Sequence, residues 1–176
     1  AAMVAWVKRI GATAVLIDIK DDSGRVTFLT DNDNHPTISP KINGRVSAFV
    51  DALNEEGIYV IGRLVSFKDN TYPRRSKSVR ILDKRTEKAW RDRKNTLWMD
   101  PFSKDARDYL VSIAKSAENA GFDEIALDYV RFPVEPDTAY ARFTHQKRGQ
   151  SRHEAISALL KQIDETIRIP LSVDVF

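Results

Sequence analysis

The sequence contains no cysteine and no long apolar run among its 176 residues. The lack of cysteine excludes disulfides, thiolate zinc sites and a cysteine nucleophile. No stretch reaches the roughly 18 consecutive apolar residues of a membrane-spanning helix. The three histidines, His35, His145 and His153, are scattered without a metal-ligand spacing, and no glycine-rich phosphate loop follows a predicted strand. We therefore predict no metal site and no cofactor.

Length and composition indicate one domain with a real core. Apolar residues make up 42% of the chain and charged residues 30%, and no Pro- or Ser-rich linker divides it. No signal-peptide pattern is present, and the helical pattern starts at once, so we expect that the native N-terminus is missing. Residues 74–94 hold ten Lys or Arg against three acids, so the net charge of +3 is concentrated locally.

Apolar periodicity predicts helices that alternate with short strands. The predicted helices lie near residues 1–10, 46–53, 103–117 and 151–167, and the strands at 14–19, 58–67, 124–130 and 170–176. A minor strand is predicted over 25–30, a loop over 31–40, and a long polar excursion over 68–102. Alternating helices and strands indicate a parallel sheet with right-handed crossovers. The prediction is an α/β fold, a partial (β/α) barrel of about four units that fills residues 1–176 as a single catalytic domain.

Aspartates lie at or near the carboxyl ends of three predicted strands, where parallel α/β folds place their active sites. Strand alternation puts Asp18, Asp128 and Asp174 on faces that can converge at one mouth, with Lys20 on the same face as Asp18. Paired carboxylates are what glycoside hydrolysis requires. The alternative is that each aspartate caps the next helix or neutralises a nearby arginine.

Cations are expected near these acids, because a buried charge without a partner is costly. Arg63, within a predicted strand, and Lys20 are candidates to orient sugar hydroxyls or tune the carboxylates. Arg131 is placed to keep Asp128 ionised by its charge. Trp98 and Trp90 are candidates to stack on sugar rings, with core packing as the alternative for each.

The segment GFDEIALDYVRFP at 121–133 resembles the signature of a bacterial family of inferred glycoside hydrolases with a TIM-barrel domain. Four further segments match in order: VLIDIKDD at 15–22, GIYVIGRLVSFK at 57–68, WMDP at 98–101 and SVDVF at 172–176. The family is similar in outline to the alpha-amylase superfamily. That resemblance implies Asp128 as the nucleophile and Asp174 in the place of the acid. An aspartate there, in place of glutamate, puts a retaining mechanism in doubt.

By the same resemblance the four strands are the second to fifth of a barrel, and four strands cannot close one. We therefore expect a fragment, or half of an assembly completed by missing strands or a partner chain. The predicted function is hydrolysis of a polysaccharide, in a secreted or cell-envelope setting, with Asp128 and Asp174 catalytic. The predicted substrate-binding residues are Asp18, Lys20, Arg63, Trp98 and Arg131.

Three other functions stay open at this point. One is a non-catalytic carbohydrate-binding barrel. A second is a nucleic-acid-binding module that uses residues 74–94, although aromatic residues are too sparse there for a stacking platform and no nucleic acid is expected. The third is phosphoryl transfer through Asp18, Asp21 and Asp22, which is disfavoured because Lys20 occupies the second position of the D-x-D pattern.

Overall fold

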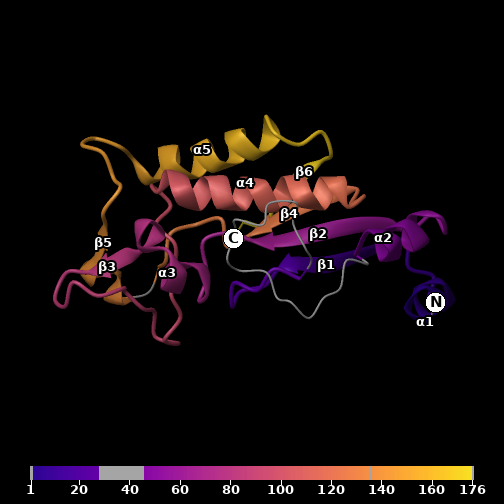
Figure 1. Ribbon diagram of the computed structural model, residues 1–176, viewed down its shortest axis with the longest axis horizontal. Helices are drawn as coiled ribbons and strands as arrows, with labels where there is room; N and C mark the ends of the chain where they lie inside the picture. Colours follow the sequence, from indigo (N-terminus) through magenta and orange to yellow (C-terminus); the bar gives the residue numbers. More distant parts are fainter. Residues whose placement is uncertain (1, 28–45, 135, 176) are drawn as a thin grey trace.

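The computed structural model describes residues 2–27, 46–134 and 136–175. Its centre is a parallel sheet in the order β1-β2-β4-β6 (Figure 1). The strands are β1 (Ala14–Lys20), β2 (Tyr59–Val65), β4 (Glu124–Asp128) and β6 (Leu171–Val173). In register, Asp18 pairs with Arg63, Val65 with Asp128, and Leu127 with Val173. The predicted parallel partial barrel is confirmed.

The predicted helices are confirmed as α1 (Ala2–Arg9), α2 (Val46–Asn54), α4 (Lys104–Asn119) and α5 (Arg152–Asp164). The Ser103 hydroxyl caps α4 by accepting from the amide of Ala106, and Ser151 with Glu154 forms the predicted capping box at α5. Helix α4 lies along one face of the sheet, and α5 packs on α4 (Figure 1). Fully buried strand residues form the core under α4: Val60, Leu64, Ile125 and Leu127.

The other face of the sheet is open. Leu16 is 56% exposed and Tyr59 39% exposed, although both lie on strands. Beside them, the carboxylate of Glu124 accepts hydrogen bonds from the hydroxyls of Tyr59 and Ser172. In a closed barrel this face is the interior. Within the described residues β1 and β6 are the two free edges of the sheet.

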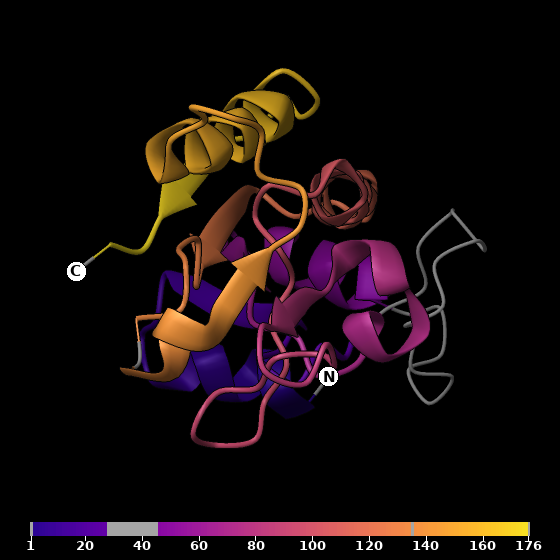
Figure 2. The ribbon, with the colours of Figure 1, turned by 90° about the vertical axis from the view of Figure 1, so that its left-hand side faces the viewer.

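Residues 68–102, predicted as a long polar excursion with little periodicity, are folded around short regular elements. They contain α3 (Tyr72–Arg75), the short 3₁₀ helix η1 (Lys77–Val79) and β3 (Ile81–Asp83). β3 pairs antiparallel with β5 (Ala141–Phe143), which follows the 3₁₀ helix η2 (Pro136–Tyr140). A three-residue strand has no detectable period, and its partner lies about 60 residues away. Figure 2 faces this end of the molecule, beyond the carboxyl ends of β2 and β4.

Two predicted strands are shorter than expected: the strand predicted at 170–176 is β6, with three residues, and the minor strand at 25–30 is reduced to a bridge in its described part. In the described part of 25–30, Val26 alone forms a bridge, to Lys20. The rest of that segment, the predicted loop at 31–40, and Phe176 lie outside the described residues. None of the helices in the described ranges is long and apolar enough to cross a membrane.

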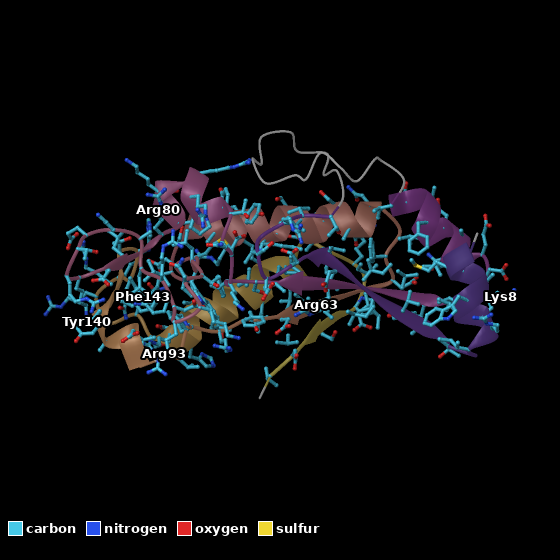
Figure 3. All side chains as sticks on the ribbon, turned by 90° about the horizontal axis from the view of Figure 1, so that it is seen from below. Lys8, Arg63, Arg80, Arg93, Tyr140 and Phe143 are labelled. Atoms are coloured by element: carbon cyan, nitrogen blue, oxygen red, sulfur yellow. The ribbon has the colours of Figure 1, made fainter. Side chains whose placement is uncertain are left out.

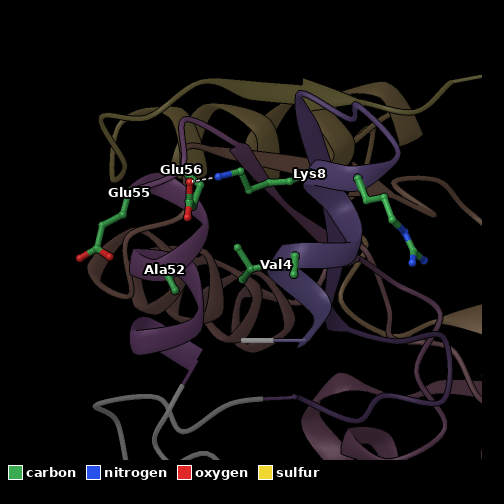
Figure 4. A pocket seen from close by; sticks show the side chains of 7 residues that line it. Val4, Lys8, Ala52, Glu55 and Glu56 are labelled. Carbon is green, nitrogen blue, oxygen red and sulfur yellow. Dashed lines mark hydrogen bonds and ion pairs between the residues drawn. The ribbon is translucent and has the colours of Figure 1, made fainter.

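A surface hollow of about 630 Å³ lies between α1 and α2 (Figure 4). It is bordered by the ion pair between Lys8 and Glu56. Lys8 lies at one end of the molecule, and Arg80 and Arg93 lie at the other, with Arg63 between them (Figure 3). The hollow is therefore remote from the carboxyl ends of the strands.

Candidate active site

Asp128 ends β4 and is held by Arg63 from the neighbouring strand β2. Arg63 Nε donates to Asp128 Oδ2 at 3.0 Å, and Arg63 Nη2 donates to the same oxygen. Arg63 Nη1 donates to Asp18 Oδ1 at 2.8 Å. One guanidinium therefore joins carboxylates from β1 and β4 across the face that a barrel would enclose. The predicted neighbourhood of Asp18, Arg63 and Asp128 is present in the structure.

The pKa of Arg63 reflects this position. Partial burial acts to lower the pKa, but the hydrogen bonds to Asp18 and Asp128 and the charges of both carboxylates outweigh it, so the pKa is raised. Arg63 therefore stays a cation and offers Asp128 a permanent positive partner. The Asp128 side chain is only 11% exposed, against 45% for Asp18. Asp128 is thus the more enclosed of the two acids.

The backbone after Asp128 takes an uncommon conformation. Tyr129 has φ +50°, in the left-handed region that a tyrosine seldom adopts. Its amide donates to Asp128 Oδ1 at 2.6 Å. Both oxygens of Asp128 are thereby engaged, one by Arg63 and the other by the next amide. Strained backbone that persists in a well-packed structure is often found at functional sites.

Asp174 directly follows β6, the strand next to β4. Its amide donates to the carbonyl of Leu127 at 2.8 Å, so the ladder between the two strands continues to the level of Asp128. The residue is exposed and lines a pocket of about 100 Å³ together with Tyr129, Val130, Arg131 and Val175. Asp174 is therefore accessible on the strand end adjacent to Asp128.

Lys20 does not contribute to this site, which contradicts its expected role in binding substrate. It is fully buried, and its ammonium lies 3.1 Å from the buried carboxylate of Asp69. It also donates to the carbonyls of Val65 at 2.8 Å and Lys68 at 3.3 Å. The strand register shifts between Asp18 and Lys20, and this irregularity breaks the alternation that placed them on one face. Lys20 instead secures the chain where β2 ends.

The Lys20–Asp69 pair requires a glycine beside it. Gly24 has φ +84°, and a Cβ there would lie 2.0 Å from Asp69 Oδ1. We expect Gly24→Ala to lower the free energy of unfolding by about 2–4 kcal/mol, because it combines backbone strain with displacement of a buried carboxylate. Urea unfolding measures this. Gly57→Ala is the matched control, since Gly57 has φ +72° and nothing within 4 Å of the added methyl. Equal losses in the two variants would contradict the steric argument.

Trp98 is also buried, and the expectation that it binds sugar is not supported by its position. It is 3% exposed, its indole N–H donates to Asp92 Oδ2 at 3.0 Å, and its ring meets Tyr129 edge-on at 5.8 Å. Trp90 is 1% exposed and also belongs to the core. The isolated bridge between Lys68 and Trp98 draws this part of the chain inward.

The prediction that the charge of Arg131 acts on Asp128 stays a prediction, since the guanidinium that hydrogen-bonds to Asp128 is that of Arg63. The Arg131 guanidinium lies over the rings of Trp98 at 5.4 Å and Tyr129 at 5.2 Å. These cation–π contacts join Arg131 to the two aromatic side chains beside the site. Because Arg131 also lines the pocket of Asp174, it remains a candidate to contact a ligand there.

Sequence reasoning missed Lys68 and Tyr129. The Lys68 ammonium lies 3.0 Å from Asp22 Oδ2 and 4.7 Å from the centre of the Tyr129 ring. Burial acts to lower the pKa of Lys68, but the hydrogen bond and charge of Asp22 raise it overall. Tyr129 directly follows Asp128 in the sequence, and that adjacency was the one available signal. No signal in the sequence pointed to Lys68, because its neighbours in the structure come from distant segments.

The three aspartates considered for phosphoryl transfer have separate partners. Asp18 pairs with Arg63, Asp22 with Lys68, and Asp21 accepts from the amides of Ser23 and Arg25. In the described ranges no group of three or more His, Asp or Glu side chains is arranged to hold a metal ion. The three carboxylates therefore do not form one ligand set.

Comparison with known proteins gives the same picture of the fold. A crystal structure of a hypothetical protein from Ruminiclostridium thermocellum ATCC 27405 is 34% identical, with a TM-score of 0.86 over 99% of this chain and 90% of that one. Alpha-L-fucosidase isoenzyme 2 from Paenibacillus thiaminolyticus is 14% identical, with a TM-score of 0.67. The match covers 98% of this chain and 28% of the fucosidase.

Trehalose-6-phosphate hydrolase from Bacillus licheniformis is 10% identical, with a TM-score of 0.62, and the match covers 99% of this chain and 40% of the hydrolase. At these identities the two enzymes show a shared TIM-barrel-type fold, and this chain spans less than half the length of either enzyme. No curated protein sequence matches the chain. The model of one family matches residues 1–176 in full. The chain therefore belongs to the family described as "Putative glycosyl hydrolase domain".

Proposed function

We propose that this chain carries the catalytic residues of a glycoside hydrolase that cleaves glycosidic bonds within a polysaccharide. The observation that supports this best is the state of Asp128: an enclosed carboxylate at a strand end, held on one oxygen by Arg63 and on the other by the Tyr129 amide. A carboxylate held in this way is suited to attack or stabilise an oxocarbenium-like centre. It is poorly suited to donate a proton.

Asp174 is the proposed acid and base. It is exposed on the neighbouring strand end, so a leaving-group oxygen or a water molecule can reach it. Its environment differs from that of Asp128, which is enclosed and accepts hydrogen bonds from Arg63. Two carboxylates in different surroundings can divide the roles of nucleophile and acid. Asp18 and Arg63 are proposed to orient sugar hydroxyls at the same face.

The test is hydrolysis by the full-length polypeptide. Polysaccharides of differing backbone are incubated with it, and new reducing ends are measured. We expect release from at least one polymer and loss of that release in Asp174→Asn as well as in Asp128→Asn. Binding without release, unchanged in both variants, would instead indicate a carbohydrate-binding barrel. The anomeric configuration of the first product, followed by NMR, then reports whether the pair retains or inverts.

A further inference from the structure

Positive charge in this protein is concentrated at the end of the sheet that carries Asp128. Two of the connections that follow strand carboxyl ends there are residues 66–103, between β2 and α4, and residues 129–151, between β4 and α5. We call them together the rim. By sequence the rim holds 15 Lys and Arg and seven Asp and Glu, which gives it a formal charge of +8. The rest of the chain holds 13 Lys and Arg and 18 Asp and Glu, which gives it a formal charge of −5.

The rim is built directly on the candidate active site. Lys68 and Trp98, near the two ends of the first connection, pair with each other, and Trp98 packs on Tyr129, the residue after Asp128. β3 from the first connection pairs with β5 from the second, so the two form one unit. In Figure 1 this unit lies beyond the carboxyl ends of β2 and β4. In barrel enzymes, loops in this position contact the substrate.

The acids of the rim neutralise only some of its bases. Asp83 pairs with Arg85, Glu87 with Arg142, and Asp92 accepts from the Trp98 indole. Several exposed bases make no ion pair within the described part of the chain, among them Arg75, Lys77, Lys88 and Lys94. Exposed like charges gathered on one surface raise the local concentration of an oppositely charged ligand.

We propose that the rim selects an anionic polysaccharide, one with repeated carboxylate, sulfate or phosphate groups, as the substrate of this site. The inference rests on the proposed glycosidase function. Nucleic acid is disfavoured because single-strand binding needs exposed aromatic rings. Tyr72, Trp90 and Trp98 of the rim are at most 9% exposed. Tyr140 is more exposed, but the Arg85 guanidinium lies 3.9 Å from its ring centre and covers one face.

The test measures binding of the full-length polypeptide to matched polymers with and without charge. The pairs are polygalacturonate and its methyl ester, dextran sulfate and dextran, and carboxymethylcellulose and hydroxyethylcellulose, with a 20-nucleotide poly-dT as the nucleic acid probe. We expect at least one anionic member to bind tenfold or more tightly than its neutral partner, with an affinity that falls as salt rises. Poly-dT should bind more weakly than that polymer.

The triple variant Arg75→Gln, Lys77→Gln, Lys88→Gln should lose about tenfold in affinity for the anionic polymer. The matched control, Arg9→Gln, Lys161→Gln, Arg168→Gln, removes the same charge from exposed positions outside the rim and should bind like the wild type. Equal binding to charged and neutral partners in all three pairs, no binding at all, tighter binding to poly-dT, or equal losses in both triples would overturn the proposal.

Failure of this inference is distinguishable from failure of the proposed function. If the protein hydrolyses a neutral polymer, depends on Asp128 to do so and shows no preference for charged polymers, the proposed selectivity is wrong and the proposed glycosidase function stands. If the protein binds an anionic polymer in a salt-dependent way but releases no reducing ends, the proposed selectivity stands and the proposed enzymatic function is wrong.

Discussion

Asp128→Asn should reduce hydrolysis by about 10⁴-fold, the scale expected when a group that acts directly in the chemical step is removed. The amide keeps the shape of the carboxylate, so contacts to Arg63 and the Tyr129 amide can persist in part. It cannot supply the negative charge that a developing oxocarbenium ion requires. The measurement is kcat and KM for the polymer identified in the hydrolysis test. We expect the loss in kcat, with KM changed by less than about threefold.

Asp18→Asn is the matched control for this variant. Asp18 is bonded to the same guanidinium, but its side chain is 45% exposed, against 11% for Asp128. We expect a loss of less than about tenfold, because the role proposed for Asp18 is to orient substrate. If both substitutions reduced kcat to the same degree, Asp128 would have no special role. Thermal unfolding of both variants checks that neither loss reflects misfolding.

Lys20→Met should lower the free energy of unfolding by about 3–5 kcal/mol, the cost of leaving one member of a buried ion pair without its partner. Both side chains of the pair are 0% exposed. Methionine fills a similar volume, so the loss reflects charge and hydrogen bonds rather than a cavity. Three backbone carbonyls, those of Val65, Ser66 and Lys68, also lose their donor. Urea unfolding with an unchanged m-value measures the effect.

Two controls separate the pair from a general effect of removing lysine. Lys8→Met breaks the exposed pair with Glu56, whose side chains are 52% and 42% exposed, and should cost less than about 1 kcal/mol. Adding Asp69→Asn to Lys20→Met should restore part of the stability. The asparagine oxygen can still accept from the amides of Thr71 and Tyr72 without a buried charge. A double variant less stable than Lys20→Met would contradict the ion-pair explanation.

The elements that the sequence predicted well are those specified by neighbouring residues. The capping box of Ser151 and Glu154 marks the start of α5 within one turn, and the apolar periods of α2 and α4 are complete within each helix. β4 was recognisable because its period of two and the segment around Asp128 are both local. The short elements within residues 68–102 were not predicted, since β3 is stabilised by β5 from another connection. No pattern within a three-residue strand can indicate a partner strand so far away in the sequence.

The candidate site likewise contains residues that local patterns predicted and residues that only distant contacts place. Alternation along the strands placed Asp18, Asp128 and Asp174 on faces that can converge, with Arg63 expected within reach, and the structure joins Asp18 and Asp128 through Arg63. It misplaced Lys20, because one irregularity in β1 redirects that side chain into the core. The sequence did not indicate that Trp98 is buried edge-on against Tyr129 with the Arg131 guanidinium over both rings, because Trp98 comes from a separate connection.

By itself, the sequence determined the order of the helices and strands that build the parallel sheet, the aspartates at the strand ends and the basic character of residues 74–94. These follow from periodicity, capping and composition, which act over a few residues. Only the tertiary structure decided that Arg63 hydrogen-bonds to Asp128, that Lys20 is buried against Asp69, and that the connection containing α3 and β3 lies beyond the carboxyl ends of β2 and β4. Those outcomes depend on strand register and on pairing between distant segments, and their energies are set by burial that no local pattern records.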